Sequence, residues 1–199
     1  MADPGLETER LLMRELTLDD ADDLFVILGD EETMRFYPAP KTREQTIGWI
    51  EWNVRSYQQH GFGLWALVLK ETGEFVGDCG LTIQEVDGES FVEVGYHVKK
   101  AHWRRGLATE AAMACRDHAF DSLAVDRLIA LVNVENLPSA GVARKLGMMV
   151  WRETMRSGLT HLVYSMGPDG RRRSASQVTE AAASPADSPA TSAGHRGAL

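Results

Sequence analysis

The stretch that decides the fold is Phe91–Ala111, "FVEVGYHVKKAHWRRGLATEA". It opens with a pattern typical of a β-strand and closes with alanine-rich sequence that favours a helix. The turn between them holds two arginines and Gly106. A loop that enters a helix directs unpaired backbone N–H groups outward, and small residues such as Gly106 and Ala108 let a ligand come close. The turn is therefore a candidate anion site.

Start signals for helices precede this stretch. Thr17 with Asp20, and Thr42 with Gln45, have the threonine-to-acid or amide spacing of a capping box. We expect helices after both threonines, the second ending near Gly61. The remaining predicted elements are strands at 10–16, 64–69, 75–83, 91–98, 127–134, 148–155 and 160–166, and helices at about 106–120 and 138–147.

This order predicts an α/β (α+β) fold with a mixed, mostly antiparallel sheet. An antiparallel meander comes first, and a parallel βαβ crossing follows in the middle of the chain. The chain has 199 residues and is 44% hydrophobic, which suits one domain. We assign that domain to residues 1–167. Residues 168–199 are rich in Ala, Ser, Pro and Gly, and we expect a disordered tail there.

Composition argues against several classes of protein. The formal charge is −8, which disfavours nucleic acid as a partner, including through Arg104, Arg105 and the basic run 171–173. No apolar run reaches membrane-spanning length and no secretory leader is recognisable, so we expect a cytoplasmic protein. The two cysteines suit buried reduced thiols, and the six histidines show no metal-ligand spacing, so no metal is expected.

Several motifs occur together in a familiar order: "LETERLLMRELTLDDADDL", "GFGLWALV", "FVGDCGL", "VEVGYHVKKAHWRRGLATEA" and "NVENLPSAGVARKLGM". In this order the chain resembles the GNAT-superfamily N-acetyltransferases, and more narrowly their RimJ/RimL-like branch of ribosomal-protein N-terminal acetyltransferases. The resemblance covers about residues 6–167. It implies a GNAT-like sheet flanked by helices, with a central βαβ site for acetyl-CoA as co-substrate.

The resemblance also implies which residues meet acetyl-CoA. The superfamily signature Gln/Arg-x-x-Gly-x-Gly/Ala falls on Trp103–Ala108, with tryptophan at its first position as in the RimJ/RimL-like branch. The backbone from Arg104 to Thr109 would hold the pyrophosphate, and the strand end would pair with the pantetheine arm. The implied contacts are His97, Val98, Trp103, Arg104, Arg105, Gly106, Leu107, Ala108, Thr109 and Asn136. Two alternatives stay open, since Val98 suits a plain core position and Asn136 suits a helix cap.

The implied chemistry is direct attack of a neutral amine on the thioester. A backbone N–H near Val98 is the expected oxyanion donor, and Glu93 is the candidate base. Tyr96 is expected on the same alternation as Glu93 only if no bulge intervenes, because a bulge would shift the phase of the strand. The tyrosine that many members place near the sulfur is Ala143 here. Ser139 is our candidate near the leaving sulfur, with a helix-cap role equally open.

The resemblance implies a primary amine as the acceptor, either a protein N-terminus or a small molecule. Phe36, Tyr37, Trp52 and Trp65 are candidates for an acceptor channel, although aromatic residues at such spacings more often belong to the core. The absent tyrosine and the basic tail also suit a non-catalytic acyl-CoA sensor. Exposed edge strands are compatible with a homodimer.

Overall fold

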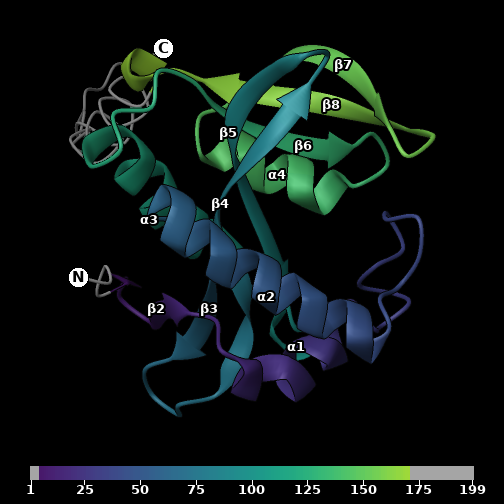
Figure 1. Ribbon diagram of the computed structural model, residues 1–199. Helices are drawn as coiled ribbons and strands as arrows, with labels where there is room; N and C mark the ends of the chain where they lie inside the picture. Colours follow the sequence, from purple (N-terminus) through teal and green to yellow (C-terminus); the bar gives the residue numbers. More distant parts are fainter. Residues whose placement is uncertain (1–4, 171–199) are drawn as a thin grey trace, which may run out of the picture.

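A computed structural model describes residues 5–170, which are built around one eight-stranded sheet (Figure 1). Its strand order is β1-β2-β3-β4-β5-β6-β8-β7. The strands are β1 Leu6–Glu7, β2 Leu11–Glu15, β3 Leu64–Leu69, β4 Phe75–Val86, β5 Glu89–Val98, β6 Leu128–Asn133, β7 Met149–Arg156 and β8 Leu159–Met166. The helices are α1 Ala21–Leu28, α2 Arg43–His60, α3 Leu107–Asp121 and α4 Leu137–Lys145, with short 3₁₀ helices η1 Leu18–Asp20 and η2 Lys100–His102.

The predicted mixed sheet is confirmed. The β5–β6 pair is parallel and is joined through α3, whereas the other described pairs are antiparallel. Strand β1 was not predicted, because two residues are too few to show a periodicity. The predicted limits of α2 are confirmed by its ends: Thr42 accepts a hydrogen bond from the backbone N–H of Gln45, and Gly61 closes the helix in the left-handed conformation.

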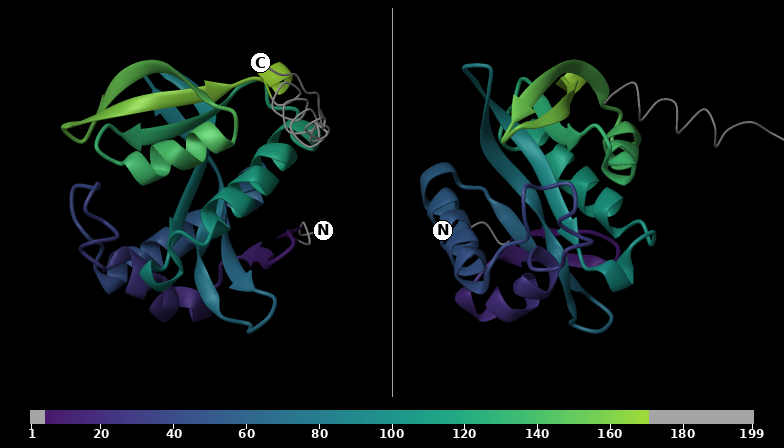
Figure 2. Two further views of the ribbon diagram at one scale, coloured as in Figure 1. Left: turned by 180° about the vertical axis from the view of Figure 1, so that it is seen from behind. Right: turned by 90° about the vertical axis from the view of Figure 1, so that its right-hand side faces the viewer.

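Helices cover both faces of the sheet. Helices α1 and α2 lie on one face and α3 and α4 on the other, as the right-hand view of Figure 2 shows. Each face has an apolar core, one with Leu24 and Ile50 and the other with Leu107 and Ala111. The free thiols Cys79 and Cys115 are buried in the second core. Both sides of the sheet are therefore anchored, which fixes the strands between them.

The sheet splits between β5 and β6. Parallel pairing covers only Val92 with Leu128 and Glu93 with Ile129. Beyond that point the Glu93 carboxylate spans the two strands, because its Oε1 accepts the backbone N–H of Leu131 at 3.2 Å. The C-terminal half of β5 thus leaves β6 and creates the space in which a cleft can form.

The β4–β5 ladder, in contrast, is regular. Its register runs without a shift from Gly77 opposite Val98 to Val86 opposite Glu89. With no bulge in β5, side chains alternate strictly along the strand. Glu93 and His97 therefore project from one face. Tyr96 projects from the other, so the expectation that a strand without a bulge would place it on the face of Glu93 is wrong, because the two residues are an odd number of positions apart.

An ion pair between Arg14 and Asp20 fixes the start of α1. Arg14 donates two hydrogen bonds, at 2.8 and 2.7 Å, to the Asp20 carboxylate, which also accepts the backbone N–H of Thr17. Burial alone would raise the pKa of Asp20, but the bonds from Arg14 and Thr17 outweigh it and lower that pKa. A carboxyl with a lowered pKa stabilises the fold above its unfolded pKa of about 3.9 and loses this effect as pH falls.

We expect Asp20→Asn to lower the free energy of unfolding at pH 7 by about 1.5–3 kcal/mol, as for hydrogen bonds to a charged group. Asp19→Asn is the matched control, because Asp19 is exposed. Urea unfolding should separate the two variants at pH 7, and the gap should shrink toward pH 3. An equal gap at both pH values would show that the charge of Asp20 is not what stabilises this turn.

The described chain ends in a helical turn at residues 168–170, directly after β8. Residues 171–199 lie outside the described residues, so the domain boundary at 167 and the disordered tail stay predictions. Within residues 5–170, no helix combines the length and the apolar character needed to cross a bilayer. The cytoplasmic location stays a prediction.

Candidate active site

Two cavities meet at the split in the sheet. The turn cavity, about 440 Å³, follows the loop before α3 and the start of α4. The cleft cavity, about 280 Å³, lies between the separated strands β5 and β6 and reaches the β7–β8 hairpin. Their common wall consists of Phe36, Tyr37, Tyr96, His97 and Ser139. A group held in one cavity can therefore approach a group held in the other.

The turn cavity collects most of the residues that the sequence predicted for acetyl-CoA. Its lining includes His97, Val98, Trp103, Arg104, Gly106, Leu107, Ala108, Thr109 and Asn136. Arg105 is not in that lining. Its guanidinium lies 2.9 Å from His102 Nδ1, and its carbonyl accepts a hydrogen bond from Arg10. The structure thus separates the two arginines, with Arg104 at the cavity and Arg105 turned away from it.

The start of α3 has the geometry of an anion site. Gly106 is the residue before the helix, has φ of 83°, and offers no side chain to cap the first N–H groups. A Cβ built on Gly106 would meet only Arg10 Nη2, at 3.5 Å, so the space above this backbone is open. Free space, helix N–H groups and the nearby Arg104 fit a phosphate group. The residues present therefore suit the pyrophosphate of acetyl-CoA.

Trp103 ties this turn to the end of β5. Its indole N–H donates to the Val98 carbonyl at 2.6 Å. On the other side of the strand, the N–H of Lys99 donates to Val76. Because backbone groups alternate along a strand, the Val98 N–H points away from β4 and toward the split. The carbonyl of Val98 already has a partner, and its N–H is the group directed at the cavity.

The start of α4 brings Ser139 against Tyr96. Asn136 caps this helix by accepting the Ser139 N–H at 3.1 Å, so the cap role that the sequence left open is observed, and Asn136 also lines the turn cavity. The Tyr96 hydroxyl lies 2.9 Å from Ser139 Oγ and donates to the Ser139 carbonyl at 3.1 Å. Burial raises the pKa of Tyr96, so this hydroxyl stays protonated. It is a proton donor on the wall between the cavities.

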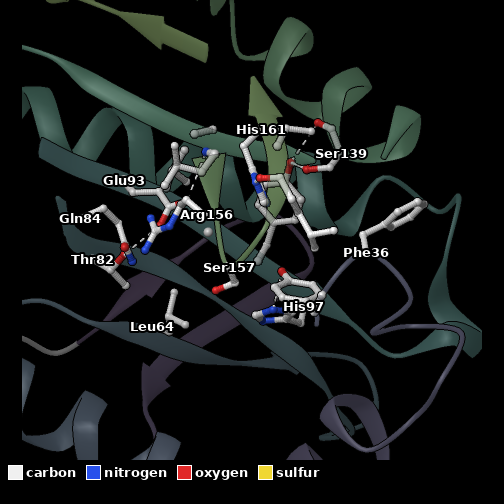
Figure 3. A pocket seen from close by; sticks show the side chains of 18 of the residues that line it. Phe36, Leu64, Thr82, Gln84, Glu93, His97, Ser139, Arg156, Ser157 and His161 are labelled. Carbon is white, nitrogen blue, oxygen red and sulfur yellow. Dashed lines mark hydrogen bonds between the residues drawn. The ribbon is translucent and has the colours of Figure 1, made fainter. Parts of the chain in front are cut away.

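The cleft cavity holds a half-buried carboxyl group beside an arginine. Glu93 accepts hydrogen bonds from Leu131 N and from Thr82 Oγ1, both at 3.2 Å, and lies next to Arg156 (Figure 3). Burial raises the pKa of Glu93, and the bond from Leu131, the charge of Arg156 and the bond from Thr82 offset this only in part. The cavity therefore presents groups of both signs to a polar ligand.

A second acid lies behind the common wall. The Asp78 side chain is fully buried and lies 2.7 Å from His97 Nδ1. On the far side of the ring, His97 Nε2 lies 2.9 Å from the Tyr37 hydroxyl. Neither Asp78 nor this use of the His97 side chain was predicted from the sequence. The signal that could have shown it is an aspartate in the middle of the otherwise apolar "FVGDCGL".

Comparison with known proteins agrees with this geometry. Residues 10–149 match the model of the GNAT acetyltransferase domain. The chain belongs to the GNAT acetyltransferase family. It is 37% identical to the uncharacterized protein YkkB of Bacillus subtilis. The match spans 144 residues, which are 72% of this chain and 84% of that protein.

Solved GNAT structures share the fold. An acetyltransferase from Agrobacterium tumefaciens superposes with a TM-score of 0.73 at 30% identity, over 83% of this chain and 95% of that one. RimL, a ribosomal L7/L12 alpha-N-protein acetyltransferase solved with coenzyme A, superposes with a TM-score of 0.68 at 16% identity, over 82% of this chain and 97% of that one. The resemblance to the superfamily is thereby confirmed, and the likeness to RimL is one of fold.

The aromatic residues considered for an acceptor channel in this GNAT protein fall into two groups. Phe36 and Tyr37 line both cavities, whereas Trp65 is 1% exposed and belongs to the core. Trp52 is outside both linings and packs on Trp49, with ring centroids 5.2 Å apart. Trp49, which the sequence did not single out, lines the cleft cavity. Within residues 5–170 no cluster of three or more potential metal ligands is present.

Proposed function

We propose that this GNAT protein transfers the acetyl group of acetyl-CoA directly to a primary amine, either a protein N-terminus or a small molecule. The observation that carries the proposal is the wall shared by the turn cavity and the cleft cavity. Acetyl-CoA would occupy the first with its thioester at the wall, and the amine would approach through the second. Holding both reactants at one boundary makes the reaction effectively unimolecular.

The turn cavity would hold the co-substrate by its phosphates and its amide arm. The N–H groups around Gly106, with Arg104, would bind the pyrophosphate. The end of β5 would pair with the pantetheine, and Asn136 would meet it from α4. The Val98 N–H, directed at the split, would stabilise the oxyanion that forms on the thioester carbonyl.

The leaving thiolate needs a proton as the C–S bond breaks. Ser139 was the sequence candidate for this end of the reaction. The short contact between Ser139 Oγ and the Tyr96 hydroxyl supports a pair in which Tyr96 supplies the proton. This pair would do the work of the tyrosine that other members carry where this chain has Ala143.

The acceptor would enter as an ammonium and needs a carboxylate near its path. Glu93 lines the cleft cavity and was the sequence candidate for the base. We propose that Glu93 attracts the ammonium. Arg156 also lines the cleft cavity and would favour an acceptor that carries a polar or anionic group in addition to its amine.

The experiment that tests the function is an acceptor panel with acetyl-CoA. The panel holds short peptides that begin with serine, alanine or methionine, together with spermidine and free lysine. We expect thiol release with at least one acceptor, and a mass increase of one acetyl group on its amine. Binding of acetyl-CoA without turnover of any acceptor would instead favour the alternative, a non-catalytic acyl-CoA sensor. The homodimer also stays a prediction, which size-exclusion chromatography with light scattering would test.

A further inference from the structure

Asp78, His97 and Tyr37 form a hydrogen-bonded chain that ends at the wall between the two cavities. We propose that this chain is the proton relay that deprotonates the acceptor ammonium, with Tyr37 touching the acceptor and His97 acting as the base. The inference rests on the proposed function. It gives Asp78 and the side chains of His97 and Tyr37 a role separate from those of Ser139 and Glu93.

Asp78 sets the orientation and the tautomer of the His97 ring. Its Oδ1 accepts the His97 backbone N–H at 3.1 Å and lies 2.7 Å from Nδ1, and its Oδ2 accepts the Trp49 indole N–H at 3.2 Å. A carboxylate only accepts hydrogen bonds, so Nδ1 carries the hydrogen and Nε2 keeps its lone pair. The His97 side chain is 9% exposed, and that of Asp78 is 0% exposed. Few water molecules can therefore compete for these bonds.

Tyr37 connects this buried pair to the cavities. It lies in the loop between α1 and α2 and is 44% exposed as a residue, yet its hydroxyl turns inward to His97 Nε2. Burial raises the pKa of the hydroxyl, with smaller effects from Glu93, Asp78 and Tyr96. Tyr37 therefore stays protonated at rest. It can donate to His97 while its oxygen lone pairs accept a hydrogen from an ammonium.

Glu93 is less suited to the same task. Its Oε1 accepts the Leu131 N–H from β6 and its Oε2 accepts the Thr82 hydroxyl from β4, so both oxygens are engaged in bonds between strands. His97, in contrast, offers one ring nitrogen whose partner is a hydroxyl that can exchange its proton. The charged and titratable groups that face the Asp78–His97–Tyr37 chain are Glu93, near His97 and Tyr37, Lys41, near Asp78, and Tyr96, near Tyr37.

The protons balance in this scheme. One N–H bond of the ammonium breaks, its proton joins the Tyr37 oxygen, and the Tyr37 proton passes to His97 Nε2. The imidazolium is held against the Asp78 carboxylate. The neutral amine then forms the C–N bond. As the C–S bond breaks, the thiolate takes the proton of Tyr96, and the second amine proton replaces it on the Tyr96 oxygen. His97 returns its proton to solvent after the product leaves.

The kinetic test uses the best acceptor of the panel and follows kcat across pH. We expect His97→Gln to lower kcat about 100-fold at pH 7, within the range of general-base catalysis, with little change in the KM for acetyl-CoA. The deficit should shrink toward pH 9, where more of the amine is already neutral. Tyr37→Phe, a change in an exposed loop that should not disturb folding, should show the same pH-dependent deficit in a smaller degree.

Two comparison variants distinguish the relay from catalysis by a different base in the cleft cavity. His161→Gln removes another histidine of that cavity, and Glu93→Gln removes the other candidate base. In the unsubstituted protein, kcat should fall at low pH as His97 becomes protonated, which gives the pH profile an acidic limb. His161→Gln and Glu93→Gln should keep this limb, and His97→Gln should lose it. If Glu93→Gln loses that limb and His97→Gln keeps it, the relay is wrong while the proposed function stands. An unsubstituted protein that acetylates no member of the panel would overturn both.

A measurement without turnover tests the resting chain. In ¹⁵N-labelled full-length protein, long-range ¹H–¹⁵N spectra should show His97 with hydrogen on Nδ1 and none on Nε2. Tyr37→Phe should shift the Nε2 resonance, because it removes the hydrogen bond there. A His97 ring with its hydrogen on Nε2 would overturn the relay, whatever the activity.

Discussion

Gly106→Val is expected to abolish the thermal stabilisation by acetyl-CoA. In the unsubstituted protein, a 100-fold excess over Kd adds about 2.7 kcal/mol to the free energy of unfolding. For a domain of this size that corresponds to a rise in Tm of roughly 5–10 °C. A valine at position 106 would add a side chain to the lining of the turn cavity, where the phosphates are proposed to bind, and would strain a backbone with φ of 83°. The variant should therefore show no shift in a thermal melt.

The control must carry the same backbone strain away from the site. Gly88, in the β4–β5 hairpin turn, has φ of 87° against 83° for Gly106, and a Cβ there would meet no atom within 4 Å. Gly88→Val should lower the Tm of the free protein to a similar degree and keep the full acetyl-CoA shift. Arg104→Ala should keep most of it, because in the proposed binding mode backbone N–H groups provide the main contacts. A Gly106→Val protein that still binds, beside an Arg104→Ala protein that does not, would reverse this ranking.

Tyr96→Phe is expected to lower kcat about 100-fold and to leave acetyl-CoA binding intact. The substitution removes the hydroxyl 2.9 Å from Ser139 Oγ, and with it the proposed proton donor to the thiolate. Because the loss falls on the leaving group, it should persist at high pH, unlike the deficit of His97→Gln. Thiol release and a thermal melt on the same samples measure both effects.

Tyr164→Phe is the matched control for this change. Tyr164 is buried on β8, and its hydroxyl has no hydrogen-bond partner among the described residues. Its removal should leave kcat unchanged. If Tyr96→Phe keeps full activity and Ser139→Ala loses it, Ser139 alone gives the proton to the leaving thiolate, and the proposed Tyr96–Ser139 pair is wrong.

The local parts of this fold could be predicted because their signals are local. The capping residues Thr42 and Gln45 stand three apart, and the turn before α3 lies within one stretch of sequence. The resemblance to the GNAT family added the acetyl-CoA contacts, nine of which line one cavity. Arg105 is the exception, because its orientation depends on His102 and Arg10 rather than on its place in the motif.

The relay could not be predicted, because its members are distant in sequence. His97 meets Asp78 only through the register of β4 against β5, and it meets Tyr37 only through the path of a loop sixty positions away in the chain. A pattern search sees an aspartate in one strand and a histidine in the next, but no reason for their contact. Glu93 and Tyr96 show the same limit, since their faces became known only when the ladder proved regular.

The early end of the β5–β6 pairing gives this sheet an internal edge. An outer edge strand invites other chains to pair with it, and proteins usually shield such strands. The internal edge of β5 is shielded at both ends. At one end Glu93 accepts a hydrogen bond from β6, and at the other the Trp103 indole donates a hydrogen bond to the Val98 carbonyl. What remains open is a short, narrow length of backbone. A slender, flexible molecule with its own amide groups could pair there as an additional strand, whereas a folded partner would be too wide to enter.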